Sequence, residues 1–299
     1  MLSFLPGPIR GTLALLLHSL NTLLCCVPLF TLAVLKLLLP IRPARNVLNR
    51  LLDGIAVLWI AINGGIHRLT QKRRWHIEGL ETLKKRDWYL VLANHQSWAD
   101  IFVLQNIFNN RIPFMKFFLK QELIWVPVIG LAWWALDFPF MQRFSKSYLA
   151  KHPEMKGKDM ETTRKACAKF KHMPVSIMNF VEGTRFTPSK HARQQSPFKH
   201  LLKPKAGGAG FVMTAMGEQI HKVLDVTIAY PQQARSFWDF LCGKITDVHV
   251  HVRSIPVTPE LIGNYEDDAA YRVRFQAWLN QLWQEKDLRI EQMLAKTAA

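Results

Sequence analysis

The sequence predicts an α/β protein, in which helices flank a mostly parallel β-sheet and a membrane-embedded helical segment precedes the sheet. Two observations predict this class. Short apolar runs typical of buried strands alternate with helix-like stretches through residues 71–299. Residues 1–70 instead contain long apolar runs with few charges. We therefore expect two parts, a membrane anchor at residues 1–70 and a globular domain at residues 71–299.

Residues 12–39 form the first apolar run, whose only strongly polar side chains are His18, Asn21 and Lys36. About 20 apolar residues are enough for a helix to cross a bilayer, so this run is long enough to span. It exceeds the core of a secretory signal, and no small-residue cleavage pattern closes it. We expect it to stay in the protein as an anchor.

A second, shorter apolar run at residues 51–66 carries Asp53 and Asn63. These polar side chains leave two alternatives, a tilted helix that pairs with the first one or a re-entrant element. Three arginines lie between the two runs, and positive residues beside apolar segments favour the cytoplasmic side. They are Arg42, Arg45 and Arg50. We expect the globular domain to face the cytoplasm at the cell inner membrane.

Several segments of the globular part are expected strands. They are residues 74–79, 89–93, 112–117, 175–181 and 223–229. Near the end of the chain, apolar residues recur at the i, i+3, i+4, i+7, i+8 spacing of an amphipathic helix. They are Phe275, Trp278, Leu279, Leu282 and Trp283. We expect this stripe to pack on the domain, with contact to lipid as the alternative.

A histidine and an aspartate follow the expected strand 89–93, after Asn94, a plausible helix cap. A histidine takes a proton from an alcohol near neutral pH, and does so better when a carboxylate holds its other ring nitrogen. His95 and Asp100 would not share a face of one helix, so His95 should lie in a turn and Asp100 in the first turns of the helix. The alternative is a hydrogen-bonded pair that only fixes the turn.

Residues 180–185 set a carboxylate, Glu182, and a guanidinium, Arg185, around Gly183. Arginine meets phosphate oxygens with paired donors, and glycine lets backbone N–H groups approach an anion. Lysines and arginines, without any acidic residue, continue to residue 205. We expect an anion site here, with a solvated loop as the alternative for the lysines. Parallel strands end at one edge of a sheet, so this turn and His95 should meet there.

These two segments, in this order and at this distance, resemble the glycerolipid acyltransferase family, whose best-known members are the lysophosphatidic acid acyltransferases. The family's first block matches Asn94, His95 and Asp100. Its third matches residues 180–185, with Val181 where the family usually has proline. The weaker second and fourth blocks correspond to residues 130–143 and 226–231, and the whole resemblance covers about residues 71–255. It implies the acyltransferase fold.

The resemblance implies a membrane-bound enzyme that transfers a fatty acyl group from a thioester to the free hydroxyl of a lysophospholipid, first of all 1-acyl-sn-glycerol-3-phosphate, giving phosphatidic acid. His95 would be the general base and Asp100 would orient it. The implied substrate-binding residues are Arg143, Glu182, Gly183, Thr184 and Arg185. No bound cofactor is implied, and acyl-coenzyme A or an acyl carrier protein thioester would be the co-substrate. A lysocardiolipin or lysophosphatidylglycerol type of acceptor stays open.

Lys116 and Lys120 lie in an apolar stretch between the first two blocks. Charges in such surroundings need a partner, so one of them, for which we take Lys120, is expected to face the headgroup phosphate. The alternative is that both side chains reach the membrane surface from an apolar setting.

The net charge of +17 favours an acidic partner. No zinc-finger, helix-turn-helix or RNA-binding signature is present, and an apolar anchor argues against nucleic acid. Membrane phospholipids, the lysophospholipid and acyl carrier protein are the expected partners. Two other classes stay open. One is a non-catalytic membrane protein that binds lipid or a carrier, and the other is a thioesterase or lipase, although no Gly-x-Ser-x-Gly elbow is present.

Three further patterns predict no separate chemistry. His249 and His251 share one face of a strand-like run but have no third ligand at useful spacing, so we expect no metal site. The glycine-rich residues 207–210 lack the end of a phosphate-binding loop, which favours close packing or room for an acyl chain. The 4 cysteines show neither a disulfide framework nor metal-ligand spacing.

Overall fold

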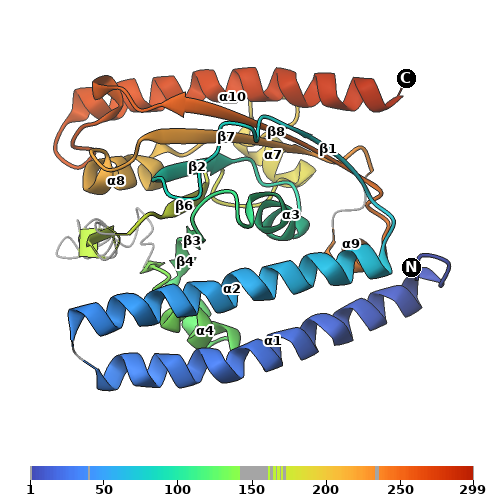
Figure 1. The fold of residues 1–299 in the computed structure, drawn as a ribbon. Coiled ribbons are helices and arrows are strands. Elements are labelled where there is room, and N and C mark those ends of the chain that lie inside the picture. The colour runs from blue at the N-terminus through green and yellow to red at the C-terminus, as the bar shows by residue number, and fades with distance from the viewer. Residues whose placement is uncertain are drawn as a thin grey trace.

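The computed structural model describes residues 2–39, 41–141, 161, 164–165, 167–168, 170, 173–232 and 236–298. Its centre is a 6-stranded sheet with the order β1-β8-β7-β2-β6-β3 (Figure 1). All neighbouring strands are parallel except β7 and β8. The strands are β1 (Arg74–Glu78), β2 (Tyr89–Ala93), β3 (Met115–Phe117), β6 (Ser176–Phe180), β7 (Lys222–Ala229) and β8 (Asp247–Pro256). The predicted α/β class with a mostly parallel sheet is confirmed.

Helices cover both faces of the sheet. In the globular part they are α3 (Ala99–Phe108), α4 (Ile129–Ala135), α7 (Pro188–Gln194), α8 (Ala206–Met216), α9 (Phe237–Leu241) and α10 (Ala269–Ala298). Short elements complete the described part: β4 (Leu119–Lys120), η1 (Gln121–Trp125), β5 (Phe140–Met141) and η3 (Pro259–Leu261). Figure 1 shows α10 along one face of the sheet and α3 on the other, with the two N-terminal helices beyond α3.

Strand β2 lies inside the sheet, and its side chains point alternately to the two faces. Leu90 and Leu92 belong to the core formed with α8 and α10. Tyr89, Val91 and Ala93 belong to the core formed with α3. A parallel strand covered on both faces is apolar at every position, which explains the continuous run in the sequence. This burial fixes β2, and with it the point where the polar residues after Ala93 begin.

The amphipathic stripe near the C-terminus packs on the sheet. Helix α10 lies along one face of the sheet (Figure 1). Its residues Phe275, Leu279, Leu282 and Trp283 are buried in the same core as Leu90, with Trp278 partly buried against it. The predicted packing is therefore correct, and contact of these residues with lipid is not supported.

The N-terminal segment is a pair of helices, α1 (Gly7–Leu38) and α2 (Arg42–Thr70), each long and apolar enough to cross a membrane. Polar side chains join the two along their facing sides. Asn63 accepts hydrogen bonds from His18 at 2.8 Å and from Asn21 at 2.9 Å. The leucines on the opposite face of α1, among them Leu16 and Leu24, are exposed. The polar residues that interrupt both apolar runs thus hold the pair together.

Strand β3 begins at Met115, later than the predicted start at residue 112. The backbone N–H groups of Arg111 and Ile112 donate to Phe108 O at 3.0 and 3.3 Å, so these residues continue the turn after α3. Pro113 follows and has no N–H to donate to a neighbouring strand. Both facts delay the strand.

Two of the remaining sequence patterns have structural explanations. A Cβ on Gly208 would lie 2.7 Å from Asn179 Nδ2, so α8 packs against β6 more closely than a side chain allows. The predicted close packing is therefore present. His249 stacks on His76 with ring centroids 4.2 Å apart, and no group of three metal-ligating residues occurs in the described part of the chain. The cysteines, all within described residues, are free thiols.

Candidate active site

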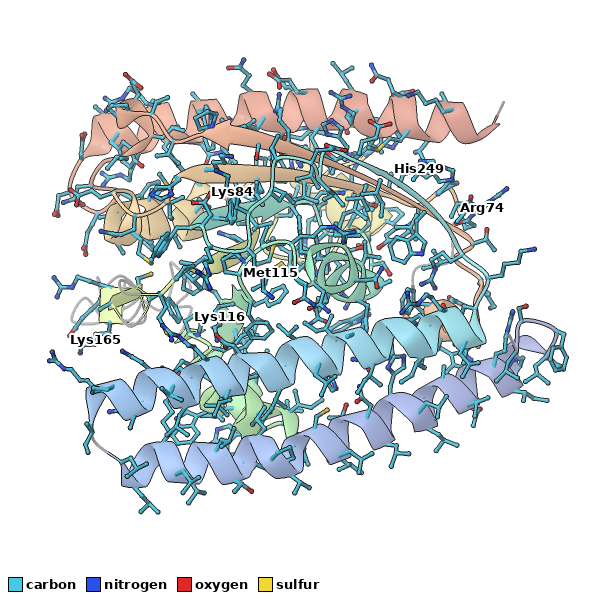
Figure 2. The ribbon with its side chains drawn as sticks, viewed as in Figure 1. Arg74, Lys84, Met115, Lys116, Lys165 and His249 are labelled. Atoms are coloured by element: carbon cyan, nitrogen blue, oxygen red, sulfur yellow. The ribbon has the colours of Figure 1, made fainter. Side chains whose placement is uncertain are left out.

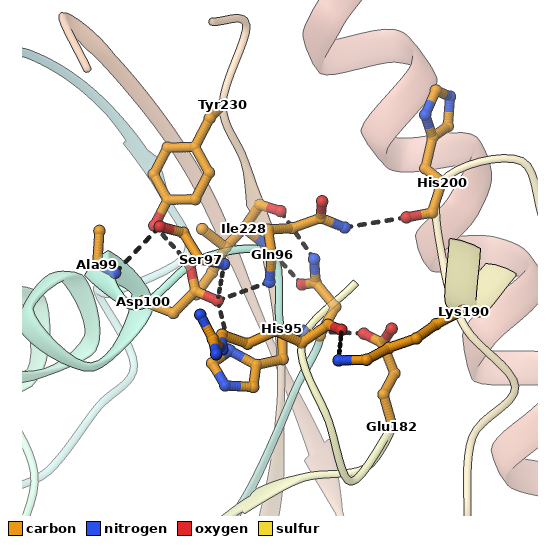
Figure 3. Close-up of polar contacts among 12 residues, drawn as sticks. His95, Gln96, Ser97, Ala99, Asp100, Glu182, Lys190, His200, Ile228 and Tyr230 are labelled. Atoms are coloured by element: carbon orange, nitrogen blue, oxygen red, sulfur yellow. Dashed lines mark hydrogen bonds and ion pairs between the residues drawn. The ribbon is translucent and has the colours of Figure 1, made fainter. Parts of the chain in front are cut away.

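His95 lies in the turn between β2 and α3, and Asp100 lies in the first turn of α3. Their side chains meet, with Nδ1 of His95 2.8 Å from Oδ2 of Asp100 (Figure 3). A carboxylate accepts, so this contact assigns the proton to Nδ1 and leaves Nε2 as the lone-pair nitrogen. The His95 side chain is 13% exposed, whereas Asp100 is fully buried. The pair therefore presents one basic nitrogen at a small opening.

The Asp100 carboxylate is held by several donors. Oδ2 also accepts the backbone N–H groups of Gln96 at 2.6 Å and Ser97 at 2.9 Å. Oδ1 accepts the hydroxyl of Tyr230 at 2.6 Å, from the residue directly after β7 (Figure 3). Buried carboxylates are stabilised by such hydrogen bonds. Sequence reasoning had not assigned Tyr230 a role, and the available signal was a hydroxyl at the end of the strand next to β2.

The end of β2 is tied to β7 by Asn94, whose predicted role as a helix cap is wrong. Its side chain accepts from Ile228 N and donates to Ile228 O, each at 2.8 Å. Trp98 occupies the cap position of α3 instead. β7 continues past the end of β2, so it offers a free backbone N–H and C=O that a side-chain amide matches. This arrangement fixes the start of the turn that carries His95.

The ring of His95 also stacks on Phe180, the last residue of β6, with centroids 4.0 Å apart and planes at 15°. Residue 180 is also the first residue of the segment matched to the third block. The two motif turns therefore lie at the same edge of the sheet, as the sequence predicted.

Glu182 connects the turn that carries His95 with its own turn after β6. Its Oε1 accepts His95 N–H at 2.8 Å, and its Oε2 accepts Leu202 N–H at 2.9 Å. The side chain is fully buried. Burial raises the pKa of Glu182 to about 8, while the two N–H donors and the charge of Lys286 act in the opposite direction. Sequence reasoning placed Glu182 on the substrate, whereas these contacts make it a positioning residue for the histidine turn.

In the rest of the turn, Gly183 is exposed and Thr184 and Arg185 are partly exposed. Gly183 has φ +69°, a conformation that favours glycine. Thr184 Oγ1 accepts from Lys190 Nζ at 2.7 Å, which fixes the turn to α7. The guanidinium carbon of Arg185 lies 4.0 Å from the ring centre of Trp98, a cation–π contact. Trp98 follows His95 by three residues, so this contact holds Arg185 beside the turn that carries His95.

One predicted substrate-binding residue, Lys120, is not brought into this site. Lys120 is exposed on β4, which pairs with β5 in a separate sheet, and within the described residues no hydrogen bond or ion pair joins it to His95 or Arg185. Arg143 lies outside the described residues. Lys116 is buried beside α2 (Figure 2) and bonds there to Asp53 at 2.7 Å, so it faces the N-terminal helices and not a headgroup.

The family model for acyltransferases matches residues 74–231, more than half of the chain. The chain therefore belongs to the acyltransferase family. It is 28% identical over 183 residues to mouse 1-acyl-sn-glycerol-3-phosphate acyltransferase delta, a match that covers 58% of this chain and 43% of the relative. A probable 1-acyl-sn-glycerol-3-phosphate acyltransferase 5 of Arabidopsis thaliana is 25% identical over 272 residues, a match that covers 86% of this chain and 66% of the relative.

These matches span about half the length of the curated relatives. Among solved structures, the crystal structure of the 1-acyl-sn-glycerophosphate acyltransferase PlsC from Thermotoga maritima aligns with 95% of this chain and 97% of that chain. Its TM-score is 0.49 and its sequence identity 17%. The match to the family model confirms, at the level of the family, the resemblance seen in the sequence.

Proposed function

We propose that this protein is a membrane-attached O-acyltransferase, which moves a fatty acyl group from a thioester to the free hydroxyl of a lysophospholipid. The preferred acceptor is 1-acyl-sn-glycerol-3-phosphate, and the product is phosphatidic acid. One observation carries the proposal. A histidine paired with a buried carboxylate and an arginine on a glycine turn lie at the same sheet edge, and the two turns are linked by the hydrogen bonds from His95 N–H to Glu182 and from Phe186 N–H to His95 O.

The reaction follows from the protonation state of the pair. Nε2 of His95 takes the proton of the acceptor hydroxyl as its oxygen attacks the thioester carbonyl. Asp100 stabilises the imidazolium that forms, since Nδ1–H already donates to it. The tetrahedral intermediate breaks its carbon–sulfur bond, and the leaving thiolate takes the proton back from Nε2. Arg185 binds the acceptor phosphate.

The donor is acyl-coenzyme A or an acyl carrier protein thioester, each a co-substrate and not a resident cofactor. Both carry phosphate and suit a basic surface. Arg193, Lys203 and Lys205, all exposed on α7 and the loop after it, have no carboxylate partner within the described residues. Lys199 of the same run is paired with Glu291 and does not contribute a free charge.

We further propose that α1 and α2 attach the protein to one leaflet instead of crossing the bilayer. A Cβ at Gly11 would lie 2.7 Å from Cys242 Sγ beside α9, and Lys36 is ion-paired with Asp137 beyond α4. These anchor points are about 38 Å apart along the helix, more than the roughly 30 Å of hydrocarbon in a bilayer. A spanning α1 would therefore pull parts of the globular domain to both surfaces.

The leaflet is the cytoplasmic one of the inner membrane, with residues 1–70 as the anchor and residues 71–299 as the catalytic domain. The exposed leucines of α1 suit an apolar boundary, and the net charge of +17 suits anionic headgroups.

The test uses purified protein, a panel of lysophospholipids and both donor types, with the products identified by mass. We expect acceptor-dependent loss of thioester and formation of phosphatidic acid, both abolished by His95→Ala. The matched control is His221→Ala, since that histidine is 58% exposed and pairs with Asp87 away from the site. Release of free fatty acid without an acceptor would indicate a hydrolase. Normal turnover by His95→Ala would show that His95 is not the general base.

A further inference from the structure

Tyr230 supplies a hydrogen bond to the site from a third strand. It follows β7 directly, and its buried hydroxyl donates to Oδ1 of Asp100 at 2.6 Å (Figure 3). The other carboxylate oxygen, Oδ2, faces His95 and two backbone N–H groups. The two carboxylate oxygens therefore have different partners, since Oδ2 accepts the hydrogen bond from His95 and Oδ1 accepts the hydrogen bond from the Tyr230 hydroxyl.

The direction of this hydrogen bond is fixed by the surroundings of the phenol. Burial, and after it the negative charge of Asp100, raise the pKa of Tyr230 well above its usual value, so the hydroxyl stays protonated and donates. The positive charge of Arg73 acts in the opposite direction and lowers the pKa of Tyr230. On the His95 side, the charged groups of the described residues include Glu182, which accepts the His95 N–H, Lys286, whose charge acts on Glu182, and Arg185, which contacts Trp98 in the same turn.

We propose that Tyr230 is a positioning residue that sets the basicity of His95 through Asp100. A donor on Oδ1 withdraws negative charge from the carboxylate, so Nδ1–H meets a weaker acceptor and the imidazolium is stabilised less. The Nε2 lone pair of His95 then remains available for the proton of the acceptor hydroxyl. Without the phenol, Asp100 would hold the imidazolium more strongly.

The backbone near Tyr230 makes this contact rigid. Ile228, two residues earlier, exchanges two hydrogen bonds with Asn94 in the turn that carries His95. One end of β7 therefore fixes both the start of the histidine turn and the orientation of the Asp100 carboxylate. This gives a physical function to the weak fourth sequence block, whose residues 226–231 end in this tyrosine and a proline.

The inference deepens the proposed function and rests on it for the kinetic readout only. We would compare wild type, Tyr230→Phe and protein with a fluorinated, more acidic tyrosine at position 230. The matched control is Tyr89→Phe, a fully buried tyrosine at the other end of β2 whose hydroxyl accepts Lys84 N–H. Two quantities are measured against pH: kcat/KM for transfer, and the rate at which diethyl pyrocarbonate modifies His95, followed by peptide mass.

In Tyr230→Phe we expect the acid limb of both profiles to move about one pH unit upward, with the KM for the acceptor unchanged. The fluorinated residue is a stronger donor and should move the limb downward. Tyr89→Phe should leave it in place. This ordered series follows donor strength, which a purely structural role of the ring would not produce.

The proposal is overturned if neither Tyr230 variant moves the His95 modification profile, or if Tyr89→Phe moves it as far. Should Tyr230→Phe fail to fold, the fluorinated protein keeps ring and hydroxyl, and an unmoved profile there would contradict the proposal. If wild type transfers no acyl group, the proposed function fails, whereas the modification profile still decides the role of Tyr230.

Discussion

Replacing Glu182 by glutamine distinguishes two roles for a buried carboxylate. Its oxygens accept the N–H groups of His95 and Leu202, and the side chain has no exposure through which to reach a substrate. Glutamine keeps the shape, but its amide nitrogen would face one of the two N–H donors and leave it unpaired. An unpaired buried donor costs about 1–3 kcal/mol. We expect the free energy of unfolding to fall by about 1–2 kcal/mol.

The catalytic effect of Glu182→Gln should exceed the effect on stability. A displacement of about 1 Å in a catalytic group costs roughly 100-fold in rate. We therefore expect a kcat about 100-fold lower with an unchanged KM for the lysophospholipid, measured by steady-state kinetics beside chemical unfolding. Glu218→Gln, which changes an exposed glutamate just after α8, should change neither quantity. A higher KM at unchanged kcat would refute the positioning role and indicate that Glu182 binds the substrate.

The same carboxyl predicts a dependence of stability on pH. The folded pKa of about 8 lies above the ordinary 4.5, so between these values the folded protein holds a proton that the unfolded chain has lost. The contribution to stability is complete below about pH 4.5 and is lost as pH rises through about 8. Wild type should lose stability more steeply than Glu182→Gln over this interval. If the stability of the two proteins fell in parallel with pH, the raised pKa of Glu182 would be contradicted.

Two further substitutions test separate contacts. Arg185→Ala should raise the KM for lysophosphatidate by about 10- to 100-fold with a smaller change in kcat, since a hydrogen bond to a charged group contributes about 1.5–3 kcal/mol. Arg193→Ala is the control. If it raised the KM for lysophosphatidate as much as Arg185→Ala does, a specific phosphate contact by Arg185 would be refuted. Asp53→Ala leaves the buried Lys116 without its carboxylate and should lower the free energy of unfolding by about 1–3 kcal/mol. An unchanged unfolding curve would show that this ion pair does not stabilise the attachment of α2.

The sequence predicts those parts of the site that depend on neighbours along the chain. His95 and Asp100 are five residues apart, and a strand that ends before a helix brings them together whatever surrounds them. Tyr230 meets Asp100 across 130 residues, and Glu182 meets His95 N–H across 87. Such contacts depend on the order of strands in the sheet, which a single sequence does not specify. The role of Glu182 could not be inferred for this reason.

The N-terminal helices illustrate the same limit. Their apolar length is evident in the sequence, and it suits a spanning helix and a surface-lying pair equally well. The difference comes from where Gly11 and Lys36 contact the globular domain, which the sequence does not contain. Lys116 is a third case, because its partner Asp53 lies 63 residues away on α2.

The most direct test is an experimental structure with an unreactive lysophosphatidate analogue and without donor. The account predicts the analogue's phosphate at the turn of Gly183 and Arg185, and its free hydroxyl within about 3 Å of Nε2 of His95. A bound analogue whose phosphate lies away from that turn, or whose hydroxyl points away from His95, would contradict it.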